Sequence, residues 1–235
     1  MRPAEFYDEF AEAQALGGIN ARHLAIDRWL ERFGLRPGMD VLEIGCGVGT
    51  QTELIAKRLA GSGTLTSIDL SPRSIELARS RLSGLPNIRL IVGDAVELSL
   101  DETFDVVVLP DVIEHIPIDE HMKLFGKVRR MLRDTGWAFI HMPNPFYLDW
   151  CRRNRPDVLQ VIDQPIFIES LVASTRPNDL YVHHLETYAI WIAEGDYQVV
   201  VLRPTPRQQS FDSPVVDRSL RARLRGAPRR LLGRD

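Results

Sequence analysis

Apolar and polar residues follow two alternating patterns along most of this chain. Short segments rich in Val, Ile and Leu are followed by longer segments in which apolar residues recur every three or four positions. The short segments predict buried β-strands, and the longer ones predict amphipathic helices. Because strands and helices alternate, we predict the α/β class: a Rossmann-like, doubly wound, mostly parallel sheet with helices on both faces. The expected strands are residues 40–44, 64–70, 88–92, 104–109, 137–142 and 197–202.

The region after the fifth expected strand departs from this alternation. Residues 146–180 show no regular period, and we expect a substrate-side insertion there rather than a disordered loop. Residues 183–187 open a segment that we predict to be helical, with Ile190, Trp191 and Ile192 inside it. Residues 203–214 are polar and rich in proline, and we find no convincing further strand in them.

The pattern divides the chain into three parts. Residues 1–36 are expected to form an N-terminal helical lid, in which Phe6, Tyr7 and Phe10 either pack on the sheet or cover a ligand. Residues 37–202 are the expected sheet domain, including the insertion at 146–180, and residues 203–235 form a basic C-terminal tail.

Residues 41–50 hold a pattern typical of a nucleotide-binding turn. A short apolar strand is followed by glycines at alternate positions, Gly45, Gly47 and Gly49, and then by a helical segment. Glycine permits the positive φ angles of a tight turn and lets the backbone approach a ligand closely. The turn ends at a helix N-terminus, where backbone N–H groups have no partner within the helix. The G-x-G-x-G spacing differs from the G-x-G-x-x-G of dinucleotide-binding proteins, so a nicotinamide-dependent oxidoreductase is a distant alternative.

Acidic residues close or follow the first three expected strands: Glu43, Asp69 and Asp94. The carboxyl ends of parallel strands meet at one edge of a sheet, where ligands bind in such folds. Asp69 suits a bidentate contact with the two hydroxyls of a ribose. The alternative is that Asp69 caps the helix beginning at Pro72, but Ser71 already fits that role.

With its glycine turn and strand-end acids, the chain resembles the class I S-adenosylmethionine-dependent methyltransferases from about residue 41 to residue 202. The resemblance implies S-adenosylmethionine as cofactor, with Asp94 accepting a hydrogen bond from the adenine amine. It also implies a seventh strand, antiparallel to the others, which we do not find in the sequence. The implied cofactor-binding residues are Glu43, Gly45, Cys46, Gly47, Gly49, Thr50, Asp69, Leu70, Asp94, Ala95 and Asp111.

A second group of residues follows the fourth expected strand. The segment 111–115 reads Asp-Val-Ile-Glu-His, and Pro143-Asn144-Pro145 and His184-Leu185-Glu186-Thr187 come later. These motifs resemble the ubiquinone-biosynthesis type of O-methyltransferase, and the acid-x-x-Glu-His spacing also resembles the small-RNA 3′-end 2′-O-methyltransferases. The second resemblance implies a divalent metal, Mg or Mn. The implied ligands are Asp111, Glu114 and His115, with His183 or His184.

Methyl transfer from a sulfonium needs an aligned acceptor and a group that takes the acceptor's proton. A neutral histidine can do this, and we expect His115 first, then His141 or His184. The metal-free alternative is that Asp111 caps a helix while Glu114 and His115 only line the pocket.

Composition and charge narrow the expected partners. The net charge is −3, but nine arginines and three aspartates give residues 203–235 a charge of +6, which leaves −9 on residues 1–202. An acidic body disfavours long polyanionic substrates, so we expect O-methylation of a small molecule or a glycan intermediate. The alternatives are an RNA 2′-O-methyltransferase with the tail as its electrostatic arm, and a cofactor-binding protein without turnover. The tail also suits contact with an acidic membrane surface, and a homodimer is compatible with the sequence.

Cysteine content and hydropathy bear on the compartment. Cys46 and Cys151 do not form a disulfide framework, and no apolar segment approaches the length of a membrane span. The first ten residues carry acids and lack the apolar region of a secretory signal, so we expect a cytoplasmic protein.

Overall fold

The computed structural model describes residues 3–160 and 162–206, except for the side chains of residues 3–7, 9 and 10. The expected roles of Phe6, Tyr7 and Phe10 as lid side chains, and of residues 207–235 as a basic tail, therefore lie outside the described residues. The account below concerns the compact unit that ends at Thr205. Within the described residues, no helix is long and apolar enough to cross a membrane.

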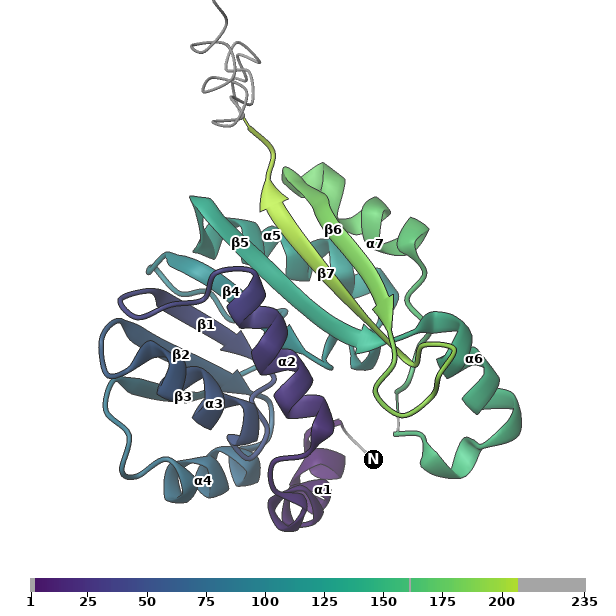
Figure 1. Cartoon of the computed structure of the whole chain (residues 1–235), viewed down its shortest axis with the longest axis horizontal. Coiled ribbons are helices and arrows are strands. Elements are labelled where there is room, and N and C mark those ends of the chain that lie inside the picture. Colours follow the sequence, from purple (N-terminus) through teal and green to yellow (C-terminus); the bar gives the residue numbers. More distant parts are fainter. Residues whose placement is uncertain (1–2, 161, 207–235) are drawn as a thin grey trace, which may run out of the picture. The chain divides into compact units, whose positions relative to one another are not determined.

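Seven strands form one sheet in the order β3-β2-β1-β4-β5-β7-β6 (Figure 1). The first five strands run parallel, and β7 is antiparallel to both β5 and β6. The predicted mostly parallel α/β sheet is thus confirmed. The strands are β1 (Asp40–Ile44), β2 (Thr64–Asp69), β3 (Ile88–Val92), β4 (Phe104–Pro110), β5 (Leu132–Pro143), β6 (Leu180–Tyr188) and β7 (Tyr197–Pro204).

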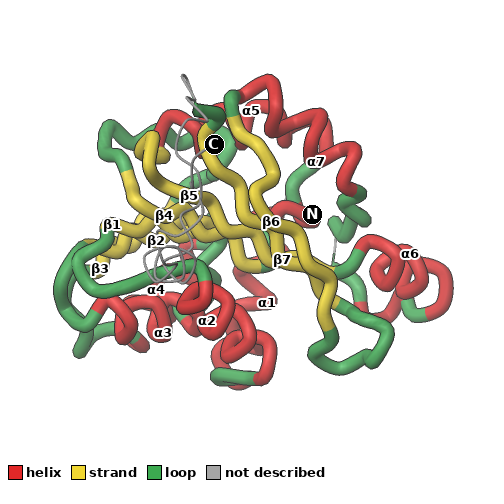
Figure 2. Tube along the Cα trace, turned by 45° about the horizontal axis from the view of Figure 1, so that its top comes forward, coloured by secondary structure: helices red, strands yellow, loops and turns green. Residues whose placement is uncertain are grey.

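Helices cover both faces of this sheet, and Figure 2 shows α2, α3 and α4 along one side of the strands and α5 and α7 along the other. The helices are α1 (Pro3–Gly17), α2 (Ala21–Arg32), α3 (Thr50–Leu59), α4 (Pro72–Arg81), α5 (His121–Met131), α6 (Pro145–Asn154) and α7 (Ile168–Thr175). Short 3-10 turns are formed by Ile113–His115, Ile118–Glu120, Pro156–Val158 and Arg176–Asn178.

Alternate residues of each central strand enter opposite cores. Val41 of β1 packs in the cluster that holds Trp29 of α2 and Ile55 of α3, whereas Leu42 packs in the cluster that holds Phe125 of α5. Side chains that point alternately to either face are the normal consequence of strand geometry. A strand buried on both faces therefore needs the continuous apolar pattern that the sequence has.

Two predictions about the C-terminal half of the sheet are wrong. The segment from His183 to Thr187, predicted as the start of a helix, belongs to strand β6. The strand at Tyr197 is the seventh along the chain rather than the sixth, and it is the antiparallel strand expected from the resemblance. β5 also begins earlier than predicted, at Leu132, with an irregular register opposite Phe104 and Val106 of β4.

The segment between β5 and β6 contains regular structure. α6 and α7 lie within or beside the region predicted as an insertion, and α7 contributes Leu171 to the core that α5 covers. The substrate-side role of residues 146–180 remains a prediction.

Candidate active site

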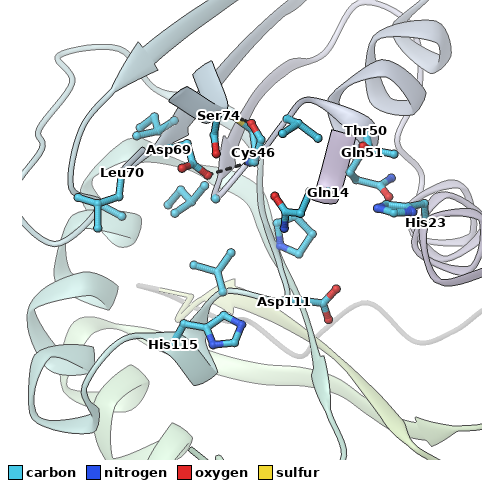
Figure 3. Close-up of a pocket in the computed structure, with 18 of the residues that line it drawn as sticks. Gln14, His23, Cys46, Thr50, Gln51, Asp69, Leu70, Ser74, Asp111 and His115 are labelled. Atoms are coloured by element: carbon cyan, nitrogen blue, oxygen red, sulfur yellow. Dashed lines mark hydrogen bonds between the residues drawn. The ribbon is translucent and has the colours of Figure 1, made fainter. Parts of the chain in front are cut away.

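A cavity of about 340 Å³ lies at the carboxyl ends of β1, β2 and β4 and beside the end of β3. Its wall also includes residues from α1, α2 and α3 and from the segment before α7. Figure 3 shows Asp69 and Leu70 on one side of this cavity, with Asp111 and His115 on the other. Ten of the predicted site residues line it: Gly45, Cys46, Gly47, Thr50, Asp69, Leu70, Asp94, Ala95, Asp111 and His115.

The glycine turn is held against the neighbouring strand by its backbone. The N–H groups of Gly45 and Cys46 both donate to the carbonyl oxygen of Ile68, at 2.8 and 3.0 Å. Gly45 has a φ of +76°, and a Cβ added there would lie 2.2 Å from Cγ2 of Val112. Glycine is therefore required at this position for two reasons, the backbone conformation and the close approach of the β4 end. Gly49 caps the N-terminus of α3 and does not line the cavity.

Asp69 sits between this turn and the beginning of α4. One of its carboxylate oxygens accepts the N–H of Gly47 at 2.7 Å, and the other accepts the N–H of Ser71 at 2.9 Å. Burial raises the pKa of Asp69, while the two backbone hydrogen bonds oppose that effect. The Ser71 hydroxyl accepts the N–H of Ser74 at 2.9 Å, so Ser71 caps α4 as expected and Asp69 faces the cavity.

Glu43 lies behind the glycine turn and does not line the cavity. Its side chain is fully buried, and Oε2 accepts hydrogen bonds from the hydroxyls of Thr52 and Ser67 at 2.7 and 2.8 Å. Burial raises the pKa of Glu43 to about 7, against the effect of these two hydroxyls. The geometry thus gives Glu43 a supporting position beneath the turn rather than a position at a ligand.

Asp111 joins three elements at the end of β4. Its Oδ1 lies 2.6 Å from Nδ1 of His141 on β5, and its Oδ2 lies 3.1 Å from Nη1 of Arg22 on α2. The other ring nitrogen of His141 lies 2.7 Å from the hydroxyl of Tyr188 on β6. Burial alone would raise the pKa of Asp111, but the charges of His141 and Arg22 outweigh it and hold the pKa at about 2. Asp111 also has a φ of +55°.

The structure brings His115 to the cavity but places the other two candidate bases elsewhere. His141 is fully buried with both ring nitrogens engaged, and it does not line the cavity. His184 lies on β6 against Trp29 of α2 and Phe33, the residue after α2, with ring centroids 6.1 and 5.1 Å away. We therefore carry only His115 forward as a candidate base.

The five residues predicted as metal ligands are not gathered into one site. Within residues 3–160 and 162–206, no group of three or more His, Cys, Asp or Glu side chains is placed to hold a metal ion. His183 is an exposed residue of β6, and Glu114 is buried beside His115 without lining the cavity. These residues do not fit the implied metal, because His183 and His184 lie on β6 and are not gathered with Asp111, Glu114 and His115 into a group that could hold a metal ion.

Seven polar residues of the cavity wall were not predicted: Gln14, Asn20, Arg22, His23, Gln51, Ser74 and Gln160. Gln51 follows the glycine turn directly, and both polar atoms of its buried amide have no hydrogen-bond partner in the described part of the chain. Figure 3 shows it beside His23. Burial lowers the pKa of His23 to about 4, and neighbouring Arg22 adds to this effect, so His23 is neutral at pH 7. A glutamine directly after a glycine turn is a sequence signal that identifies Gln51, whereas nothing local identifies the others.

Comparisons with known proteins give the class of protein. Residues 41–136 match the family described as "Methyltransferase domain". The demethylmenaquinone methyltransferase of Staphylococcus aureus strain MRSA252 is 29% identical over 110 residues, which cover 46% of this chain and 45% of that protein. The chain thus spans less than half the length of the curated relatives it matches.

Solved methyltransferases share the fold over most of the chain. A TehB-like SAM-dependent methyltransferase from Corynebacterium glutamicum has a TM-score of 0.60 at 20% identity and covers 86% of this chain and 97% of its own. DhpI in complex with SAH has a TM-score of 0.64 at 19% identity and covers 87% of this chain and 96% of its own. The expected resemblance is confirmed: residues 41–136 match a methyltransferase domain, and the chain shares its fold with solved S-adenosylmethionine-dependent methyltransferases. Within that class, its sequence relatives include demethylmenaquinone methyltransferases.

Proposed function

We propose that this chain binds S-adenosylmethionine in the cavity and transfers its methyl group to a hydroxyl of a small molecule. The observation that supports this most strongly is that one cavity is lined by the glycine turn and Asp69 on one side and by Asp111 and His115 on the other. A cofactor on the first side leaves the second side for an acceptor, which is the arrangement that direct transfer needs.

The residues around the glycine turn fit this cofactor. Gly47 has a φ of +51° and faces Gln14 across the cavity wall, so only a residue without Cβ keeps that space open. The carboxylate of Asp69 lies on the same wall, within reach of a ribose. The unpartnered buried amide of Gln51 offers a donor and an acceptor to a polar ligand group. When bound, S-adenosylmethionine supplies an electrophilic methyl group, whose bond to sulfur breaks as its bond to the acceptor oxygen forms.

His115 has the role of general base in this proposal. It takes the proton of the acceptor hydroxyl, so that the oxygen lone pair forms the new bond to carbon. Such a proton transfer contributes about 10²–10⁴-fold to a rate. Asp111 is held ionised by Arg22 and His141, and it keeps a fixed negative charge beside the acceptor. Because Arg22 compensates this charge, the acceptor side supports a neutral acceptor over an ionic one.

Three observations support a small acceptor: the volume of the cavity, the charge of residues 1–202 and the name of a sequence relative. S-adenosylmethionine would occupy the glycine-turn side of the cavity of about 340 Å³, so the remaining space suits a small molecule or the end of a larger one, such as one sugar of a glycan. The acidic body, with −9 on residues 1–202, disfavours a polyanion. The related staphylococcal protein is named for demethylmenaquinone, which is itself a small molecule.

The test uses methyl-labelled S-adenosylmethionine with purified protein and a fractionated host extract, with and without a chelator. We expect label in the small-molecule or glycan fraction, equal in both lanes. The test variant is Asp69→Asn, which alters the cavity and should lower the amount of label. Its matched control is Asp101→Asn, at an exposed acid outside the cavity, which should not. Nuclease-sensitive label would overturn the choice of acceptor in favour of RNA. Binding of S-adenosylhomocysteine without label in any fraction would favour a binding protein without turnover.

A further inference from the structure

Residues 160 and 162–164, which precede α7, are hydrogen-bonded to the 3-10 turn that carries His115 and to each other. The backbone N–H of Gln164 donates to the carbonyl oxygen of Glu114 at 3.0 Å, and its side-chain amide donates to the carbonyl oxygen of Ile116 at 3.0 Å. These bonds flank His115 on both sides in the sequence. The two hydrogen bonds from Gln164 therefore hold the backbone on either side of His115 in place.

The same segment contacts the imidazole of His115. Its Nδ1 lies 2.6 Å from the carbonyl oxygen of Ile162 and 3.3 Å from Oδ1 of Asp163. A carbonyl oxygen only accepts hydrogen bonds, so the hydrogen of this bond belongs to Nδ1. In the neutral ring, the proton-accepting nitrogen is then Nε2, because one imidazole nitrogen carries the hydrogen and the other carries the lone pair.

Asp163 is itself held in place. Its second oxygen, Oδ2, accepts the backbone N–H of Gln160 at 2.7 Å. The side chains of Asp163 and His115 are only 10% and 13% exposed. When the imidazole of His115 takes up a proton, its charge and that of the Asp163 carboxylate would therefore be weakly screened by solvent.

The other acidic groups near His115 are occupied or neutral. Glu114 has an oxygen 3.9 Å from Nε2 of His115, but burial, and next to it the charge of Asp111, raises the pKa of Glu114 well above its ordinary value. Burial therefore favours the uncharged form of Glu114. Asp111 is shared between Arg22 and His141. Asp163 is thus the carboxylate that lies beside Nδ1 of His115, while Asp111, whose pKa the charge of His115 also lowers, is engaged by Arg22 and His141.

We infer that Asp163 is a positioning residue for His115: together with the Ile162 carbonyl it fixes the tautomer with hydrogen on Nδ1 and the lone pair on Nε2. This inference rests on the proposed function, in which His115 is the base. The proton of the acceptor hydroxyl passes to Nε2, the hydrogen on Nδ1 stays in place, and the carboxylate of Asp163 stabilises the imidazolium until the proton leaves to solvent. The charge balance needs no further reactant.

The first experiment reads the tautomer without any acceptor. Long-range ¹H–¹⁵N correlation spectra of the full chain distinguish the two ring nitrogens of neutral histidines. The signals of His115 are assigned by their absence from His115→Gln. We expect His115 to carry its hydrogen on Nδ1, and a hydrogen on Nε2 would overturn the inference.

The second experiment compares Asp163→Asn with Asp157→Asn in the methyl-transfer assay. Asp163→Asn keeps the shape of the side chain and an oxygen for the Gln160 N–H but removes the charge. Asp157 is an exposed acid six residues earlier in the chain, so Asp157→Asn is the control. We expect kcat to fall about tenfold or more in Asp163→Asn, with KM for S-adenosylmethionine and affinity for S-adenosylhomocysteine unchanged, and no effect in Asp157→Asn.

The outcomes separate the two proposals. Equal kcat in wild type and Asp163→Asn would overturn the role of Asp163 while leaving the methyltransferase proposal intact. A parallel loss of cofactor affinity would overturn it as well, because it would indicate a merely structural role. Absence of transfer by the wild type would instead reject the proposed function, and the tautomer measurement would then still decide how Asp163 and Ile162 act on His115.

Discussion

Arg22 and Asp111 form an ion pair of 3.1 Å between the second helix of the chain and the end of the fourth strand. Asp111 in turn contacts His141, and His141 contacts Tyr188, so a single series of polar contacts crosses from α2 through β4 and β5 to β6. Trp29 of α2 lies 5.5 Å from the ring of Tyr188 and closes the series into a loop. Helix α2 is therefore tied to the sheet at two points, through Arg22 beside the cavity and through Trp29 against Tyr188.

Replacing His141 by phenylalanine is expected to destabilise the fold. The change keeps a ring against Tyr197, which stacks on His141 at 4.7 Å, but leaves the buried Asp111 carboxylate and the Tyr188 hydroxyl without this partner. Removing one partner of a buried charged pair costs about 3–5 kcal/mol, and we expect the free energy of unfolding in urea to fall by about that amount. His183→Phe, at an exposed position of β6, is the control and is expected to change it by less than about 0.5 kcal/mol. If His141→Phe lowers the free energy of unfolding no more than His183→Phe does, the contacts of His141 with Asp111 and Tyr188 do not stabilise the fold.

Gly45→Ala is expected to weaken binding of S-adenosylhomocysteine about tenfold or more, because the added methyl group meets Val112 and forces the turn to move. Titration calorimetry measures the loss. Adding Val112→Ala removes the atom that the new Cβ meets at 2.2 Å and is expected to restore part of the affinity, while the positive φ still costs about 1 kcal/mol. Gly84→Ala, where an added Cβ meets no atom within 4 Å, is the control. Lack of any rescue by the second substitution would show that the contact with Val112 is unimportant.

Asp69→Asn is expected to reduce affinity for S-adenosylhomocysteine roughly 10–100-fold. The carboxylate accepts two backbone N–H groups, whereas the amide offers one accepting oxygen and no charge, and hydrogen bonds to charged groups contribute about 1.5–3 kcal/mol. The same calorimetric titration on Asp101→Asn, outside the cavity, should give the wild-type affinity. Equal affinities for all three proteins would exclude Asp69 from the cofactor site.

Glu43 is expected to make stability depend on pH. Its pKa is about 7 in the folded chain and about 4.3 when unfolded, so the folded state holds the extra proton between these values. The stabilisation is complete below about pH 4 and is lost as pH rises through about 7. Glu43→Gln has the shape of the protonated acid, and we expect its advantage over the wild type to grow from about pH 4.5 to 7 and then level off. Urea unfolding at several pH values measures this difference, and a difference independent of pH would contradict it.

The first five strands could be predicted because each is a short apolar segment in a regular alternation with helices. β6 could not, because its side chains are alternately half-buried and exposed from Tyr181 to Tyr188, and the polar His183-His184-Leu185-Glu186-Thr187 also suits the first turn of a helix. An edge strand that pairs only with β7 carries a weak apolar signal of this kind. Its pairing with a strand later in the chain decides its conformation, and no local pattern encodes that.

Some residues of the candidate site could be predicted from local sequence patterns, and others could not. The glycine turn and the acids at strand ends are local patterns with a fixed place in a parallel sheet, so Gly45, Asp69 and Asp111 were predicted at the cavity. Arg22 and Gln160 reach it through tertiary packing, which the sequence does not state. His141 was expected at a ligand from its place near a strand end and Glu114 from its motif, but both are buried among protein groups instead.

The limits of the recognisable domain and the limits of the cavity do not coincide. Residues 41–136 contain the glycine turn, Asp69, Asp94 and His115, whereas Gln14, Arg22, His23 and Gln160 enclose the same space from outside that range. Similarity over residues 41–136 therefore informs about the glycine turn and the strand-end acids, but not about the residues that enclose the cavity from α1, α2 and the segment before α7. A chimera that exchanges only residues 1–36 and 146–180 with a relative is expected to change the affinity for the cofactor as well as the choice of acceptor, because Gln14 faces Gly47.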